Sequence, residues 1–303
     1  MEPRKTSRSG RWGLAASVIA CLVSAAAPAA ERVELRREEI GSYEDFRFVA
    51  EQKLVFSGSP GGPEDVSPME TTLIVEKAGR PLARHEGWRW QSLATEVPLG
   101  ADVTGDGTPS AVFANSSGGA HCCVSVFIFP LSEPVSPIIV ETSTAPSFQK
   151  LEGRNGYVIV TSDDIYGYWR SSFAYSPFPQ IILTYQGNGY QANATLAKRP
   201  ALDDDVLNAK ASAIRDGAWQ LPELPAEFLS LTLDLIYSGN AGQALTFIDR
   251  AWNPAIAGKS DFLIALFQCR LPRSAYWPTI AAMNQLPVIQ PRADCDQIDK
   301  NIY

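Results

Sequence analysis

The feature that most constrains the fold is a change of pattern near residue 200. Residues 31–199 contain short runs rich in β-branched and aromatic residues, separated by turn-forming residues. Such spacing is typical of antiparallel sheets. The runs are Phe46–Phe56, Thr71–Val75, Ala111–Phe113, Val124–Phe129, Ile138–Val140 and Tyr157–Val160. We expect a sandwich or partial propeller-like sheets, with one sheet face in solvent.

A hairpin is expected late in this region. The runs Ile181–Tyr185 and Tyr190–Ala194 flank the tetrapeptide 186–189, Gln-Gly-Asn-Gly. Glycine and asparagine tolerate the positive φ angles of tight hairpin turns.

Residues from 201 onward follow a helical period instead. The segment Pro225–Tyr237 has a broad apolar face. Gly239 suits the position after that helix, and Asn240 is expected to cap the next one. Ser260 is expected to cap a third helix, with Leu263, Leu266 and Phe267 facing inward. The predicted fold class is α+β, with an antiparallel β-rich domain at 30–199 and a small α-helical domain at 200–303.

The N-terminus predicts export. A basic segment precedes the apolar run Trp12–Ala27, and Ala27-Pro28-Ala29 forms a small-residue cleavage pattern. These are the parts of a secretory signal peptide, here residues 1–29. The run of about 16 residues is shorter than the roughly 20 that span a bilayer, so no transmembrane segment is expected. The predicted location is periplasmic or secreted.

A second processing route remains open at Cys21. Val18-Ile19-Ala20-Cys21 resembles the bacterial lipobox, in which the cysteine is acylated. The alternative location is therefore a lipoprotein anchored at Cys21. The segment after Cys21 stays apolar instead of forming a polar tether, which favours the soluble product.

Charge excludes one class of partner. The formal net charge is −7, and loss of the basic N-terminus makes the remainder more acidic. Such a chain has no electrostatic reason to bind nucleic acid. The sequence identifies no other partner.

The segment 102–110, Asp-Val-Thr-Gly-Asp-Gly-Thr-Pro-Ser, is the most specific local signal. Oxygen-bearing side chains at alternate positions, with glycine at the sixth, suit a hard cation. An EF-hand is excluded because its twelfth position would be Phe113 and a β-prone run follows. The alternative is an ordinary Asp-Gly turn held by its own side-chain hydrogen bonds.

This segment resembles the calcium loop of FG-GAP/VCBS-like repeats, Asp-x-Asn-x-Asp-Gly-x-x-Asp. The matching positions, and hence the candidate metal ligands, are Asp102, Thr104, Asp106, Thr108 and Ser110. Only two of the five are carboxylates, so the resemblance implies weak calcium binding. It covers about 30 residues and therefore implies the loop and not a closed propeller.

A longer resemblance covers most of the chain after the signal peptide. The Asp-x-Thr-Gly-Asp-Gly loop followed by Gly-Gly-Ala-His-Cys-Cys at 118–123 resembles a group of uncharacterised bacterial exported proteins. Residues 168–177 and 237–240 fit the same group. No activity comes with this resemblance.

Four cysteines follow the signal peptide: Cys122, Cys123, Cys269 and Cys295. In an oxidising compartment Cys269 and Cys295 are expected to pair and tie the third helix to the C-terminal tail. Three alternatives stay open for His121-Cys122-Cys123: a vicinal disulfide, another disulfide pairing, or thiol, copper or zinc handling.

No catalytic motif is present, so enzyme status is uncertain and a non-catalytic protein is favoured. His85 is interpreted as a lone surface histidine. Asp163, Asp164 and the aspartates 203–205 could form a carboxylate pair, although acidic loops and helix caps explain them more simply.

The favoured function is an exported, cell-envelope binding module with one calcium-type loop. One alternative is an exported hydrolase that uses the acidic and aromatic loop 163–177, and another is metal or thiol handling at residues 121–123.

Overall fold

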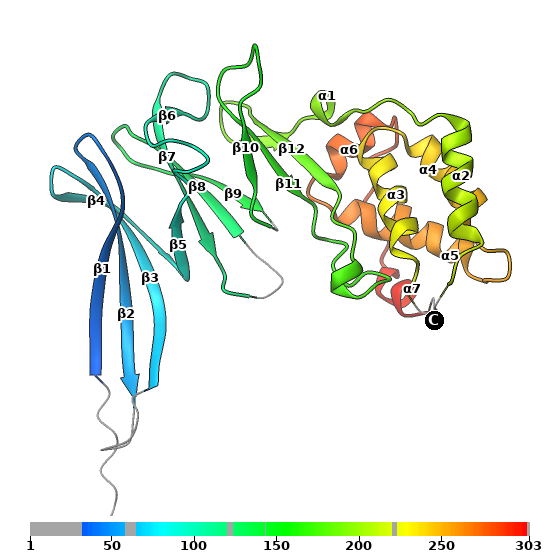
Figure 1. Cartoon of the computed structure of the whole chain (residues 1–303), viewed down its shortest axis with the longest axis horizontal. Coiled ribbons are helices and arrows are strands. Elements are labelled where there is room, and N and C mark those ends of the chain that lie inside the picture. Colours follow the sequence, from blue (N-terminus) through cyan, green and yellow to red (C-terminus); the bar gives the residue numbers. More distant parts are fainter. Residues whose placement is uncertain (1–31, 58–64, 120–123, 143, 220–222, 302–303) are drawn as a thin grey trace, which may run out of the picture.

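The computed structural model describes residues 32–57, 65–119, 124–142, 144–219 and 223–301. Three antiparallel sheets follow one another along the long axis, and the helices gather at the far end (Figure 1). The α+β prediction is confirmed, and strands give way to helices at Asn193. Within these described ranges, no helix is long and apolar enough to cross a membrane.

The first sheet is a meander whose strand order follows the chain. Its strands are β1 (Arg32–Tyr43), β2 (Phe46–Ser57), β3 (Asp65–Lys77) and β4 (Arg80–Gly87). Its outer face is solvated and carries ion pairs: Arg37 lies 3.3 Å from Glu51, and Arg84 lies 2.8 Å from Glu51. The buried side chain of Ile74 lies on this face, where Ile74 pairs in register with Arg84.

The middle sheet corrects the expectation of one solvated face. It contains β5 (Arg89–Ser92), β6 (Ala101–Asp102), β7 (Pro109–Ser116), β8 (Val124–Pro130) and β9 (Ile138–Thr142). Ala111 and Phe113 of β7 pack into a core with the first sheet, whereas Val112 packs into the main core on the opposite side. Because both faces are covered, β7 is a continuous apolar run without visible alternation.

The third sheet contains the predicted hairpin. Its strands are β10 (Ser147–Gln149), β11 (Val158–Ser162), β12 (Gln180–Tyr185) and β13 (Tyr190–Ala192). The β12–β13 turn is closed by the amide of Gln186, which donates to the carbonyl of Gly189 at 2.9 Å.

The helical part packs against this third sheet. The helices are α1 (Ala194–Ala197), α2 (Asp204–Arg215), α3 (Ala226–Tyr237), α4 (Ala241–Ala251), α5 (Lys259–Ile264), α6 (Trp277–Met283) and α7 (Cys295–Asn301). Short 3-10 turns occupy Phe173–Tyr175 and Leu271–Arg273, and a π-helical segment Ala265–Arg270 continues α5. The main core contains Ile159 and Leu183 of the third sheet together with Phe228 and Phe247 of α3 and α4.

The helix ends were predicted unevenly. Gly239 adopts φ +84° after α3, as expected for its position. Asn240 occupies the N-cap position of α4, but its side chain makes no capping hydrogen bond and donates instead to the carbonyls of Arg199 and Ser238. The amide of Ala241 donates to the side chain of Asn284, just after α6, at 2.7 Å. Ser260 does not cap α5 either, since Gly258 takes that position with φ +96°.

Candidate functional site

The Asp102–Ser110 segment forms one tight turn between β6 and β7. The carboxylate of Asp102 accepts the amide of Gly105 at 2.7 Å and the amide of Gly107 at 2.9 Å. Asp106 accepts the amide of Thr108 at 2.9 Å. This backbone hydrogen bond is the main reason why the pKa of Asp106 is lowered. The turn is therefore held by its own aspartates.

The same turn also contacts the third sheet. A Cβ atom at Gly105 would lie 2.7 Å from the backbone of Asn155, and a Cβ atom at Gly156 would lie 2.7 Å from the amide nitrogen of Gly105. The carbonyl of Val103 accepts the Tyr157 amide at 2.8 Å. The glycines at 105 and 156 allow this close approach of two backbones.

All five predicted ligands lie on the turn, but they fit a cation unequally. Asp102 and Asp106 supply carboxylate oxygens, and each carboxylate oxygen has more than one lone pair. The hydroxyl of Ser110 donates to the carbonyl of Thr108 at 3.3 Å, and Ser110 is buried, so its oxygen is less accessible to an ion than the two carboxylates. The part of the chain that the structure describes brings no three acidic, histidine or cysteine side chains together around a metal position. Among the described residues, the turn therefore offers two carboxylates, fewer than a tight calcium site uses.

The predicted bridge between Cys269 and Cys295 is present. His121, Cys122 and Cys123 lie outside the described residues, as do Cys21 and the predicted signal peptide 1–29.

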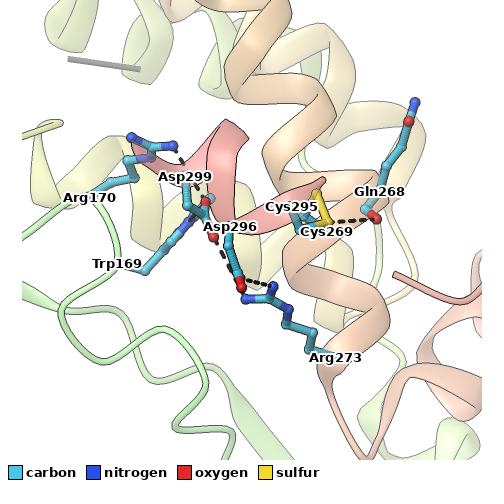
Figure 2. A network of polar contacts seen from close by, with 8 residues as sticks. All are labelled: Trp169, Arg170, Gln268, Cys269, Arg273, Cys295, Asp296 and Asp299. Atoms are coloured by element: carbon cyan, nitrogen blue, oxygen red, sulfur yellow. Dashed lines mark hydrogen bonds and ion pairs between the residues drawn. A yellow bond between two sulfur atoms is a disulfide. The ribbon is translucent and has the colours of Figure 1, made fainter. Parts of the chain in front are cut away.

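Helix α7 is held by a polar network besides this bridge (Figure 2). Asp299 lies 3.5 Å from the guanidinium of the buried Arg170 and 3.3 Å from the indole nitrogen of Trp169. Arg273 lies 2.8 Å from Asp296. Arg170 and Trp169 belong to the segment after β11, so the network joins the C-terminal helix to the β region.

Asp163 is the most buried carboxylate among the described residues, with 2% of its surface exposed. Its Oδ2 accepts hydrogen bonds from Ser274 and, at 2.6 Å, from Tyr237. The hydroxyl of Tyr237 is also 3.1 Å from that of Tyr166. Burial raises the pKa of Asp163, although these hydrogen bonds oppose the shift. Sequence reasoning missed the two hydroxyl donors, which follow Asp163 by 74 and 111 residues.

A surface pocket of about 290 Å³ adjoins this carboxylate. It is lined by Asp163, Asp164 and Tyr276, and by Glu141 from the middle sheet and Arg273 from the helical part. Glu141 accepts a hydrogen bond from Ser125 at 2.6 Å. The structure thus brings Glu141 to the pocket of Asp163 and Asp164. The aspartates at 203–205 do not line this pocket and stand at the start of α2.

Two other sequence interpretations are resolved by burial. His85 is half-buried and not fully exposed: its ring lies 5.3 Å from that of Phe129, and burial lowers its pKa. The aromatic loop divides into two groups. Tyr166 and Trp169 belong to the main core, whereas Tyr168 and Tyr175 are more than half exposed.

Comparison with known proteins adds no assignment. No protein family, no curated protein and no solved structure matches the chain.

Proposed function

We propose that the protein is a non-catalytic, exported binding module of the cell envelope whose Asp102–Ser110 turn binds one calcium ion weakly. The observation that supports the proposal is the preformed turn. Gly105 and Gly107 adopt φ +83° and φ +90°, and Asp102 is fixed by both of their amides. Little ordering is then required when an ion binds, which partly offsets the small number of carboxylates.

Thermal unfolding with calcium or with chelator tests this proposal. Because calcium binds the folded chain, stability rises by about 2.7 kcal/mol at one hundred times the dissociation constant. Asp106→Asn should remove the calcium response while preserving the fold, since Asp106 is exposed and holds a single amide. Asp45→Asn is the matched control, because it removes one charge from an exposed turn of the first sheet. Identical melting curves with calcium and chelator would leave an ordinary Asp-Gly turn.

Export is tested by N-terminal sequencing of the mature protein. We expect a start near Ala30, since Ala27-Pro28-Ala29 is the cleavage pattern. A lipidated Cys21 would replace the soluble route by membrane anchoring, and an intact Met1 would contradict both.

An exported hydrolase is the second candidate, because Glu141 and Asp163 line one pocket. A carboxyl group with a raised pKa can serve as a general acid beside an ionised partner. Against this role, Asp163 already accepts from Tyr237 and Ser274. Hydrolysis of a panel of chromogenic glycosides, lost in Glu141→Gln and kept in Asp45→Asn, would replace the binding proposal by the hydrolase.

Thiol, copper or zinc handling at His121-Cys122-Cys123 is tested separately. Mass spectrometry of the protein as isolated reports both the thiol state and any bound metal. Two free thiols with a bound metal would favour this role, whereas oxidised cysteines without metal would exclude it.

A further inference from the structure

A second pocket, separate from the calcium turn, lies where the first sheet meets β5. Its volume is about 340 Å³, and it is lined on one side by β1, β2 and β3 and on the other by residues 88–90. Figure 1 shows β5 beside the middle of the first sheet, and β5 contacts both β1 and β3. The volume lies within the range of small-ligand sites.

Two tryptophans give this pocket its shape. Trp90 is buried: its indole nitrogen donates to the carbonyl of Thr71 at 3.0 Å, and its ring lies 4.7 Å from that of Phe127. Trp88 is 50% exposed. A Cβ atom at Gly118 would lie 2.3 Å from the Trp88 indole nitrogen, so the indole packs on bare backbone. Trp88 is therefore a supported aromatic surface that remains open to solvent.

Polar side chains surround these indoles. Arg36 of β1 and Gln52 of β2 are cross-strand partners on the face that lines the pocket, and Glu38 follows two residues after Arg36. Arg89 comes from β5.

These side chains differ from those on the opposite face of the sheet. Among the described residues, Arg36, Glu38 and Arg89 have no hydrogen-bonding or ionic side-chain partner. The arginines of the outer face, such as Arg37 and Arg84, pair with Glu51.

This combination matches the chemistry of a sugar. A pyranose ring has an apolar face of C–H groups that can stack on an indole. Its hydroxyl groups can form paired hydrogen bonds with one guanidinium, carboxylate or amide group. Two guanidinium groups against one carboxylate favour a sugar that carries its own carboxylate. We propose that the pocket of Trp88, Arg36, Glu38 and Arg89 binds a saccharide, with preference for a uronic-acid unit.

The test uses the full mature protein in the presence of chelator, so that the calcium turn takes no part. An immobilised panel of neutral, amino-sugar and uronic-acid oligosaccharides identifies a bound probe, whose affinity is then measured by calorimetric titration. Trp88→Ala should weaken binding about tenfold, the effect of one lost aromatic contact. Tyr175→Ala is the matched control, because Tyr175 is 64% exposed and lies on the aromatic loop instead. Near-ultraviolet circular dichroism confirms that both variants are folded.

Charge variants then test the preference within the same pocket. Arg36→Gln should weaken binding of the uronic-acid probe, because it removes a positive charge that attracts the carboxylate of the sugar. Glu38→Gln should strengthen binding, because it removes a negative charge that repels this carboxylate and keeps a group that can form hydrogen bonds. The proposal is overturned if no member of the panel binds, or if Trp88→Ala binds as well as the wild type. It is also overturned if binding depends on Tyr175 and not on Trp88.

Discussion

Removal of the Cys269–Cys295 bridge should loosen α7 and lower the stability of the helical part. The two cysteines are separated by 26 residues, so the chain-entropy estimate of the bridge is about 3.5 kcal/mol. The pairs of Arg273 with Asp296 and Asp299 remain, but partly exposed pairs contribute only about 0–1 kcal/mol each. They cannot replace the bridge.

The assay compares the wild type with the double variant Cys269→Ala and Cys295→Ala by thermal unfolding and by hydrogen exchange. A loss of about 3.5 kcal/mol corresponds to a fall of roughly 7–14 °C in Tm for a chain of this size. Amides of α7 should exchange faster even if α3 stays protected, because the bridge restrains α7 directly. Equal Tm values together with unchanged exchange of α7 would refute this reasoning.

Two further predictions concern the turn and the buried carboxyl group. Gly156→Ala should destabilise the protein by about 2–4 kcal/mol in urea unfolding, because φ is +74° and the new Cβ would meet Gly105. Gly153→Ala, at φ +71° with open space around it, should cost only about 1 kcal/mol, and equal costs would contradict the packing argument. Burial raises the pKa of Asp163 above its usual 3.8, so the native state holds this proton more readily than the unfolded chain. The stability of the wild type relative to Asp163→Asn should therefore fall as pH rises from about 4 through the raised pKa, and a rising difference would show the opposite shift.

The local elements of this fold were largely predictable from sequence. The hairpin around residues 186–189 and the end of α3 at Gly239 depend on turn-forming residues at those positions. The α3 helix itself depends on the spacing of its apolar residues. The pairing of Cys269 with Cys295 was also expected, since it ties two neighbouring segments.

Features built from distant residues were not predictable. Asn240 stands at the predicted start of α4, but its side chain does not cap the helix, because it bonds to the distant Arg199 and to Ser238. Asn284, 43 residues away, binds the Ala241 amide. The burial of both faces of β7 depends on which sheets pack against it. A short apolar run such as Ala111–Phe113 does not show in the sequence whether one face or both faces will be buried.

The candidate sites show the same division. All five candidate ligands on the Asp102–Ser110 turn were readable as one motif, whereas the role of Gly156 in supporting the turn was not. Asp163 was recognised as an acid, but its partners Tyr237 and Ser274 come from separate helical segments. The Trp88 pocket combines four strands, so only the structure brings its residues together.

Direct calcium binding tests the central claim most simply. Titration of calcium into chelator-treated mature protein should give one site per chain with a dissociation constant of about 0.1–1 mM, as expected for weak extracellular calcium modules. Asp106→Asn should abolish this site, and magnesium should compete poorly because it requires a tighter octahedral shell. A titration without saturable binding up to about 10 mM calcium, or unchanged binding in Asp106→Asn, would contradict the assignment of the Asp102–Ser110 turn.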